Sequence, residues 1–205
     1  VENVIDRLQS KVDSYLIGLS EKELTETDNN ALSEVLQVVN EFERIGDHAD
    51  NLCDCAVTIN ENGVRYSQSA LREFSTITDA VHEVLQMAVD GYEARDIHLA
   101  NDIEPLEEVI NIMVESLKVH HNDRLRDGDC SIDSAFSFVE ILYNMERIAD
   151  HCSNVGVHIL SYSCADEVRD RHEFLREMRR TKSPEYKAKF DMYDKKYFER
   201  IGHGA

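Results

Sequence analysis

The sequence predicts an all-α protein made of two tandem three-helix bundles related by an internal repeat. Glycine and proline are scarce, at 8 and 2 of 205 residues, so the chain lacks the turn residues that a protein of many short strands needs. Apolar residues instead recur at three-and-four spacing over long stretches, which is typical of amphipathic helices. A nine-residue motif that occurs twice indicates the duplication.

Apolar periodicity places three helices in the first half of the chain. The first covers residues 1–19, and the polar turn after it offers Thr27 and Asp28 as N-cap residues for the second. The second helix ends at the Asn-Gly pair at residues 62–63, because glycine commonly follows the last turn of a helix. The third runs through residues 67–96.

Three further helices are expected in the second half. Pro105 is tolerated in a first helical turn, where its missing N–H does no harm, so a fourth helix is expected to begin there. The Asp-Gly-Asp stretch at residues 127–129 ends it, and a fifth helix covers residues 131–163. A sixth is expected from Asp166, with a break at Ser183-Pro184, where Ser183 caps the restart.

The duplication is visible residue by residue. Residues 43–51 match residues 146–154 at six of nine positions, and residues 2–6 match residues 107–111 in the same relative order. Repeats of this kind usually complete one another's core. The two units are expected at residues 1–101 and 102–205.

The repeated motif carries acids at helical spacing. Glu43, Asp47 and Asp50 share one stripe of the second helix, and Glu2 and Asp6 repeat the four-residue step on the first. Antiparallel packing of these two helices would bring the acids together. Carboxylates about 4 Å apart repel by about 4 kcal/mol at an effective dielectric of 20, so such a group must take up protons, pair with bases or bind cations. An oxygen-rich shell suits manganese, iron, magnesium or calcium and does not exclude zinc.

The second half offers the equivalent candidate ligands Glu107, Asn111, Glu146 and Asp150, with Asn154 nearby. It carries one charge fewer, because Asn111 stands where the first half has Asp6. A second metal site is therefore expected to bind more weakly.

Two other functions remain open from the residues alone. The motif is also compatible with intrahelical ion pairs on a metal-free acidic adaptor that binds basic partners. A carboxylate-bridged metalloenzyme is disfavoured, because such enzymes use Glu-x-x-His pairs and the nearest case here is Asp79-x-x-His82. His48 and His151 point away from the acidic stripe and are expected to be hydrogen-bonded packing residues. The last helix carries an aromatic seam, interpreted as core or as a docking surface for a homodimer mate: Tyr186, Phe190, Tyr193 and Tyr197.

Charge and cysteine content limit the partners and the compartment. A net charge of −19 repels phosphate backbones, so nucleic acid is excluded as a partner. Five cysteines without a disulfide or zinc-finger spacing favour a reducing cytoplasm. The first helix begins at Val1 without a cap, which suggests a segment of a longer protein.

The motifs Glu43-Arg44-Ile45-Gly46-Asp47 and Glu146-Arg147-Ile148-Ala149-Asp150, each preceded by an acid-x-x-Ile-Asp or Asn element, resemble the PhoU family. Residues 100–107, 124–130 and 150–154 look most like the cytoplasmic PhoU domain of bacterial sodium/phosphate cotransporters.

The resemblance implies a non-enzymatic regulator of phosphate uptake whose acidic motifs bind multinuclear iron or zinc clusters. The implied partners are a phosphate transporter, on the same chain or separate, and inorganic phosphate. The implied location is cytoplasmic, and the protein would be tethered to the membrane if a transporter region precedes Val1. Carried over by position, the ligands are Glu2, Asp6, Glu43, Asp47 and Asp50 in the first half, and Glu107, Asn111, Glu146, Asp150 and Asn154 in the second.

Overall fold

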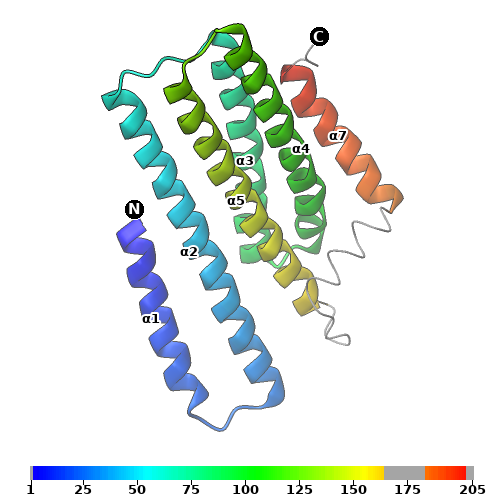
Figure 1. The fold of residues 1–205 in the computed structure, drawn as a ribbon. Helices are drawn as coiled ribbons and strands as arrows, with labels where there is room; N and C mark the ends of the chain where they lie inside the picture. Colours follow the sequence, from blue (N-terminus) through cyan, green and yellow to red (C-terminus); the bar gives the residue numbers. More distant parts are fainter. Residues whose placement is uncertain (1, 164–182, 202–205) are drawn as a thin grey trace.

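The computed structural model describes residues 2–163 and 183–201, and every regular element in this part of the chain is a helix (Figure 1). The prediction of an all-α fold is therefore confirmed. None of the described helices is both long and apolar enough to cross a membrane. The helices are α1 (Glu2–Ser20), α2 (Glu26–Glu61), α3 (Gln68–Ala94), α4 (Ile97–Asp127), α5 (Ile132–Ser163) and α7 (Pro184–Ile201).

The start of α2 differs by two or three residues from the prediction. Thr25 is the N-cap: its hydroxyl oxygen accepts a hydrogen bond from the Asp28 backbone N–H at 3.2 Å, and the Asp28 carboxylate accepts one from the Thr25 backbone N–H at 3.0 Å. This reciprocal capping box satisfies two backbone donors at once, whereas Thr27 or Asp28 as cap would satisfy one.

The predicted start of α4 at Pro105 is wrong. Asp96 caps the helix by accepting backbone hydrogen bonds from His98 and Leu99, and Pro105 lies inside it. A proline in a helix interior costs about 3 kcal/mol. Burying Ile103 and Leu106 completely contributes about 1.5–3 kcal/mol each, which outweighs that cost.

The helix after the Ser183-Pro184 break begins as predicted. The Ser183 hydroxyl accepts a hydrogen bond from the backbone N–H of Tyr186 at 3.1 Å, which is the expected cap. The predicted stretch from Asp166 up to this break lies outside the described residues.

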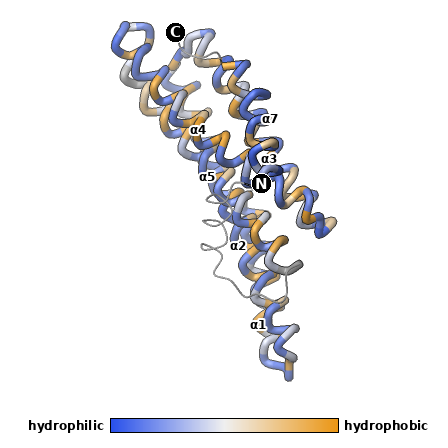
Figure 2. Tube along the Cα trace, turned by 90° about the vertical axis from the view of Figure 1, so that its right-hand side faces the viewer, coloured by the Kyte–Doolittle hydropathy of each residue, from blue (hydrophilic) through white to orange (hydrophobic). Residues whose placement is uncertain are grey.

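The helices of the two predicted units interleave. α3 packs against α4 and α5, α2 packs against α1 and α5, and α7 packs against α4 and α3. Figure 2 shows the result from the side, an elongated molecule with α1 at one end. The division at residues 101 and 102 stays a prediction. The centre of the core, between α3, α4 and α5, contains fully buried Ile77, Ile103, Ile110, Phe138 and Leu142.

The aromatic seam of α7 is mainly core. Tyr193 and Tyr197 are buried, and burial raises the pKa of both hydroxyls. The Tyr197 hydroxyl donates a hydrogen bond to Glu83 on α3, and Arg200 pairs with Asp79 at 2.6 Å. Glu83 and Asp79 of α3 therefore help to hold α7 in place.

Removing the hydroxyl of Tyr197 is expected to loosen α7. Tyr197→Phe should lower the free energy of unfolding by about 1.5–3 kcal/mol, since it deletes a hydrogen bond to a carboxylate. Urea unfolding followed by circular dichroism measures the change. The control is Tyr15→Phe at an exposed position on α1; an equal loss in both variants would contradict a specific role for the Glu83 contact.

Candidate metal site

Three predicted acids meet where α1 crosses α2. Asp6 on α1 and Glu43 and Asp47 on α2 each offer a carboxylate oxygen, and these oxygens lie within 4.8 Å of one another. Asp6 and Glu43 are half-buried and Asp47 is exposed. The antiparallel pairing of α1 and α2 therefore brings together acids that lie about forty residues apart in the sequence.

A glycine allows α1 to approach α2 closely beside these acids. A Cβ at Gly46 would lie 2.8 Å from the Cδ1 of Ile5, closer than real Cβ contacts. One turn further along α1, Gln9 Nε2 donates a hydrogen bond to Asn40 Oδ1 at 2.9 Å. The acids are thus held between an apolar contact and a polar one.

The ionised form of Glu43 is disfavoured at this site. Burial raises the pKa of Glu43, the negative charges of Asp47 and Asp6 also raise it, and Arg44 and His151 oppose them. A cation placed among the three oxygens would remove the repulsion. Three carboxylates from two helices are hard oxygen donors, which suit divalent cations. The donor set therefore fits a metal ion.

This electrostatic conflict predicts a pH effect in the metal-free chain. The folded pKa of Glu43 lies above the unfolded value, so ionisation of Glu43 costs stability above the folded pKa and nothing below about pH 4, the unfolded range. With a chelator present, Glu43→Gln should raise the free energy of unfolding at pH 7 by about 0.2–0.5 kcal/mol, the usual scale of a like-charge pair four residues apart. The gain should vanish at acidic pH.

Thermal unfolding at pH 4 and pH 7 measures this difference. Glu93→Gln, at an exposed position on α3, is the control and should change little at either pH. A loss of stability for Glu43→Gln at pH 7 would contradict the claim that the charge of Glu43 destabilises the metal-free chain.

The other two candidates in the first half differ. Asp50 is exposed and lies outside the group of three. The side chain of Glu2 lies outside the described residues, so its role as a ligand stays a prediction.

The second half places cations of the protein beside its acids. Lys118 Nζ lies 3.7 Å from Glu146, and Arg147 lies 2.8 Å from Asp150. By the repeat, Lys118 stands where the first half has Asp13. Among the described residues, one group of potential ligand side chains lies close enough together to hold a metal ion, at Asp6, Glu43 and Asp47, and the second site stays a prediction.

The remaining second-half candidates are engaged with the protein. Buried Glu107 accepts a hydrogen bond from Asn111 at 2.8 Å. Asn154 reaches across to α2 and donates to Glu41 at 3.0 Å. The contact between Glu107 and Asn111 is thus made within α4, whereas Asn154 joins α5 to α2.

A pair of histidines joins α2 to α5. His48 Nδ1 donates to Asn144 Oδ1 at 2.9 Å, His151 Nδ1 donates to Glu41 Oε2 at 2.8 Å, and the two rings stack with centroids 5.6 Å apart. Both are hydrogen-bonded packing residues, as predicted. Sequence reasoning missed their partners, although extending the repeat by two residues aligns Glu41 with Asn144.

A polar cavity of about 410 Å³ adjoins the acids. Its lining combines amide side chains with Glu41, Glu43 and the cation Arg44. Such a concave polar surface, next to a cluster of carboxylates, offers space for a small polar ligand.

Comparison with known proteins identifies the family. Residues 1–56 and 74–158 match the profile of the PhoU domain. The chain belongs to the PhoU domain family. The helices that carry the three acids, α1 and most of α2, lie in the first matched region.

Relatives with known names support this assignment. The chain is 25% identical over 142 residues to the phosphate-specific transport system accessory protein PhoU homolog 1 of Thermotoga maritima, a match that covers 69% of this chain and spans 59% of that protein's length. A PhoU homolog of Pseudomonas putida is 23% identical, with 87% of this chain and 68% of that protein covered. The crystal structure of PhoU from Pseudomonas aeruginosa has the same fold, with a TM-score of 0.73 at 20% identity over 80% of this chain and 78% of that one.

Proposed function

We propose that this PhoU domain chain is a regulatory accessory protein of phosphate uptake that binds a metal ion at Asp6, Glu43 and Asp47. The observation that carries the proposal is the convergence of these three acids within the matched family region. The curated relatives described above are named as accessory proteins of the phosphate-specific transport system, which favours a regulator and not an enzyme.

The chemistry of the site supports the metal. The ion implied by the family resemblance is iron or zinc, and both accept carboxylate oxygens in proteins. A bound ion with free coordination positions would supply an anchor for phosphate or for a carboxylate of the transporter. Asp6, Glu43 and Asp47 hold the ion, and Arg44, in the adjoining cavity, attracts an anion that approaches it.

The relatives favour a separate accessory protein over a domain attached to a sodium/phosphate cotransporter, because those compared carry the accessory name. The cotransporter arrangement, a homodimer and a cytoplasmic location stay predictions. Identifying the polypeptide that co-purifies with the chain from its natural host would distinguish the first two arrangements.

Measuring phosphate uptake in the natural host tests the proposal. Deleting the gene should change the uptake rate of radiolabelled phosphate, and Asp47→Asn should shift the rate in the same direction. The matched control is Asp150→Asn in the second half, where Arg147 already pairs with the acid; it should leave uptake near the wild-type rate. An unchanged rate after deletion contradicts the regulatory role, whereas an effect of deletion without one of Asp47→Asn contradicts the metal role alone.

A further inference from the structure

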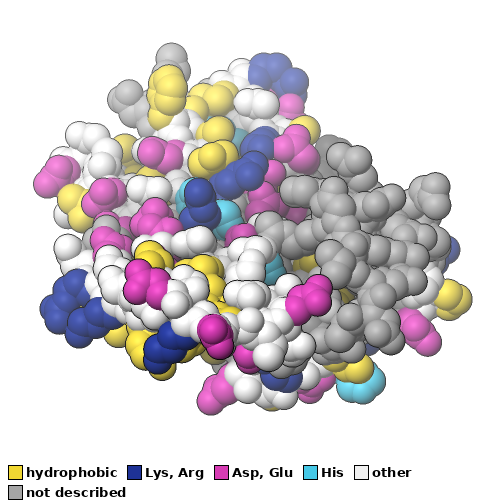
Figure 3. Space-filling view, turned by 90° about the horizontal axis from the view of Figure 1, so that it is seen from below, with side chains coloured by type: hydrophobic (Ala, Val, Ile, Leu, Met, Phe, Trp, Pro, Cys, Tyr) yellow, Lys and Arg dark blue, Asp and Glu magenta, His cyan; other side chains and the backbone are white. Residues whose placement is uncertain are grey.

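A buried histidine lies in the C-terminal half of α4. His121 is 1% exposed, and neither of its ring nitrogens has a hydrogen-bond partner among the described residues. Acidic and basic side chains, and some of the histidines, reach the surface in the view of Figure 3, where water solvates them. A buried polar group without a partner is rare in native proteins. His121 is therefore a candidate for a role other than packing.

The internal repeat shows that packing at this position does not need a histidine. Residues 2–6 align with residues 107–111, and the same offset places Leu16 of α1 at the position of His121. Leu16 is also buried, at 8% exposed. An apolar side chain therefore fills the equivalent position in the first half, and the ring nitrogens of His121 add a property that the helix packing does not require.

Aromatic rings surround the imidazole. His121 stacks on Phe138 of α5, with ring centroids 4.3 Å apart and ring planes 9° apart. The same Phe138 ring contacts Phe74 of α3 at 4.7 Å and Tyr66, in the connection between α2 and α3, at 6.2 Å. Burial raises the pKa of the Tyr66 hydroxyl, so these three neighbours are uncharged at neutral and acidic pH.

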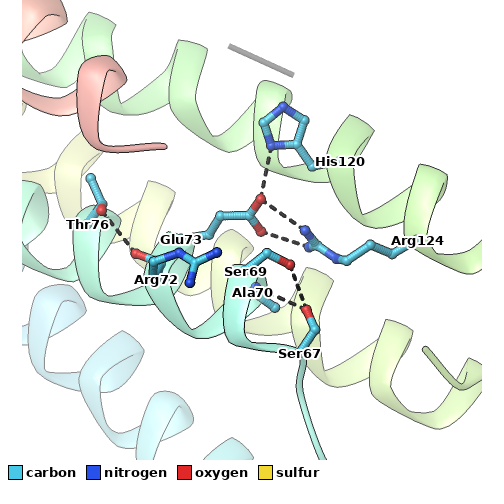
Figure 4. A network of polar contacts seen from close by, with 8 residues as sticks. All are labelled: Ser67, Ser69, Ala70, Arg72, Glu73, Thr76, His120 and Arg124. Carbon is cyan, nitrogen blue, oxygen red and sulfur yellow. Dashed lines mark hydrogen bonds and ion pairs between the residues drawn. The ribbon is translucent and has the colours of Figure 1, made fainter. Parts of the chain in front are cut away.

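The charged groups near the ring come from α4 and α3. Arg124 follows His121 by one turn of α4, and its guanidinium lies 5.2 Å from the centre of the Phe138 ring. The Glu73 carboxylate of α3 is already engaged with Arg124 at 2.8 Å and with His120 at 3.0 Å (Figure 4). Burial lowers the pKa of His121, the positive charge of Arg124 lowers it further, and Glu73 opposes both. A proton on His121 would therefore add a second positive charge beside Arg124.

We propose that His121 is an acid-sensitive switch for the packing of α4. When the ring takes up a proton, it leaves the face of Phe138 for water, and the C-terminal half of α4 separates from α3 and α5 around it. A charged imidazole is far costlier to bury than a neutral one, and histidine is the side chain that changes charge at mildly acidic pH. The switch uses none of the acids at Asp6, Glu43 and Asp47, so it does not depend on the proposed metal site.

The sign of the pH effect follows from the direction of the shift. Because the folded pKa of His121 lies below the unfolded value of about 6.5, the folded chain binds fewer protons in this range than the unfolded chain does. The contribution of neutral His121 to stability is fully present above about pH 6.5 and is lost as the pH falls toward the folded pKa. Each pH unit within this window raises the unfolding constant by up to about tenfold.

Two histidine variants of the chain provide a matched test. Leucine occupies the equivalent position in the first half, so His121→Leu keeps the core apolar. In urea unfolding with a chelator present, the unfolding constant of the wild type should rise between pH 7 and pH 5 by at least about fivefold more than that of His121→Leu. His82→Leu removes an exposed histidine from α3 and should keep the pH dependence of the wild type. Equal pH dependence of the wild type and His121→Leu overturns the inference.

Hydrogen–deuterium exchange locates the opening. After correction for the intrinsic effect of pH, peptides from residues 115–127 should exchange at least about fivefold faster at pH 5 than at pH 7 in the wild type, and should change little in His121→Leu. Faster exchange spread equally over all helices would indicate a general loss of stability and overturn the switch. Titration of the His121 ring by NMR needs no variant, and an apparent pKa at or above about 6.5 also overturns it.

Discussion

Replacing Arg124 with methionine is expected to lower the free energy of unfolding by about 3–5 kcal/mol. The Arg124 guanidinium lies 2.8 Å from Glu73, whose side chain is 6% exposed, and His120 donates to the same carboxylate at 3.0 Å. This group joins α3 to α4 at the edge of the core (Figure 4). Without Arg124, the Glu73 carboxylate would remain buried with one hydrogen-bond donor fewer, which is far costlier than losing a surface ion pair.

Chemical unfolding of two comparison variants separates burial from charge. Arg126→Met removes an arginine two residues further along α4 whose side chain is 73% exposed, and it should cost less than about 1 kcal/mol. The double variant Glu73→Met and Arg124→Met removes both partners and should recover most of the loss. A double variant as unstable as Arg124→Met alone would show that the charges do not compensate one another.

The helices were predictable because their signals are local. Three-and-four spacing of apolar residues defines α2 and α3, and an Asn-Gly pair or a serine cap marks where helices end or begin. Pro105 misled the prediction of α4, because its cost is offset by burial that arises only after the helices pack. The Glu73–Arg124 pair was not predictable, because its residues lie 51 positions apart, share no motif and meet only after the helices pack.

The first acidic cluster was predictable because its Glu-Arg-x-x-Asp motif occurs twice in the sequence. One copy of Glu-Arg-x-x-Asp is typical of an ordinary helix surface. The repeat aligns Glu43 with Glu146 and also aligns residues 2–6 with residues 107–111, which indicates that the acids of α1 belong with those of α2. The repeat could not show that Lys118 and Arg147 place cations beside the second set of acids, since the pairing of Lys118 with Glu146 depends on how α4 lies against α5.

Metal affinity is expected to fall sharply when one acid of the first cluster is neutralised. Asp47→Asn should weaken binding of Zn²⁺, or of Fe²⁺ without oxygen, by at least about tenfold, because substitutions even outside the direct ligands of metal sites cost 10–100-fold. The side chain keeps its size, and the substitution removes one of three negative charges within 4.8 Å. Isothermal titration calorimetry of the metal-free chain measures the change.

Asp150→Asn is the control that makes this result specific. Asp150 occupies the equivalent position in the repeat, but Arg147 lies 2.8 Å from it, so its charge is already balanced and its loss should leave the affinity within about twofold of wild type, on the scale of an exposed pair. Because the two variants alter net charge equally, a general electrostatic effect of this acidic chain would weaken both alike. Only direct ligation at Asp6, Glu43 and Asp47 predicts a large difference between them, and equal, weak titrations of wild type and both variants would favour the metal-free adaptor instead.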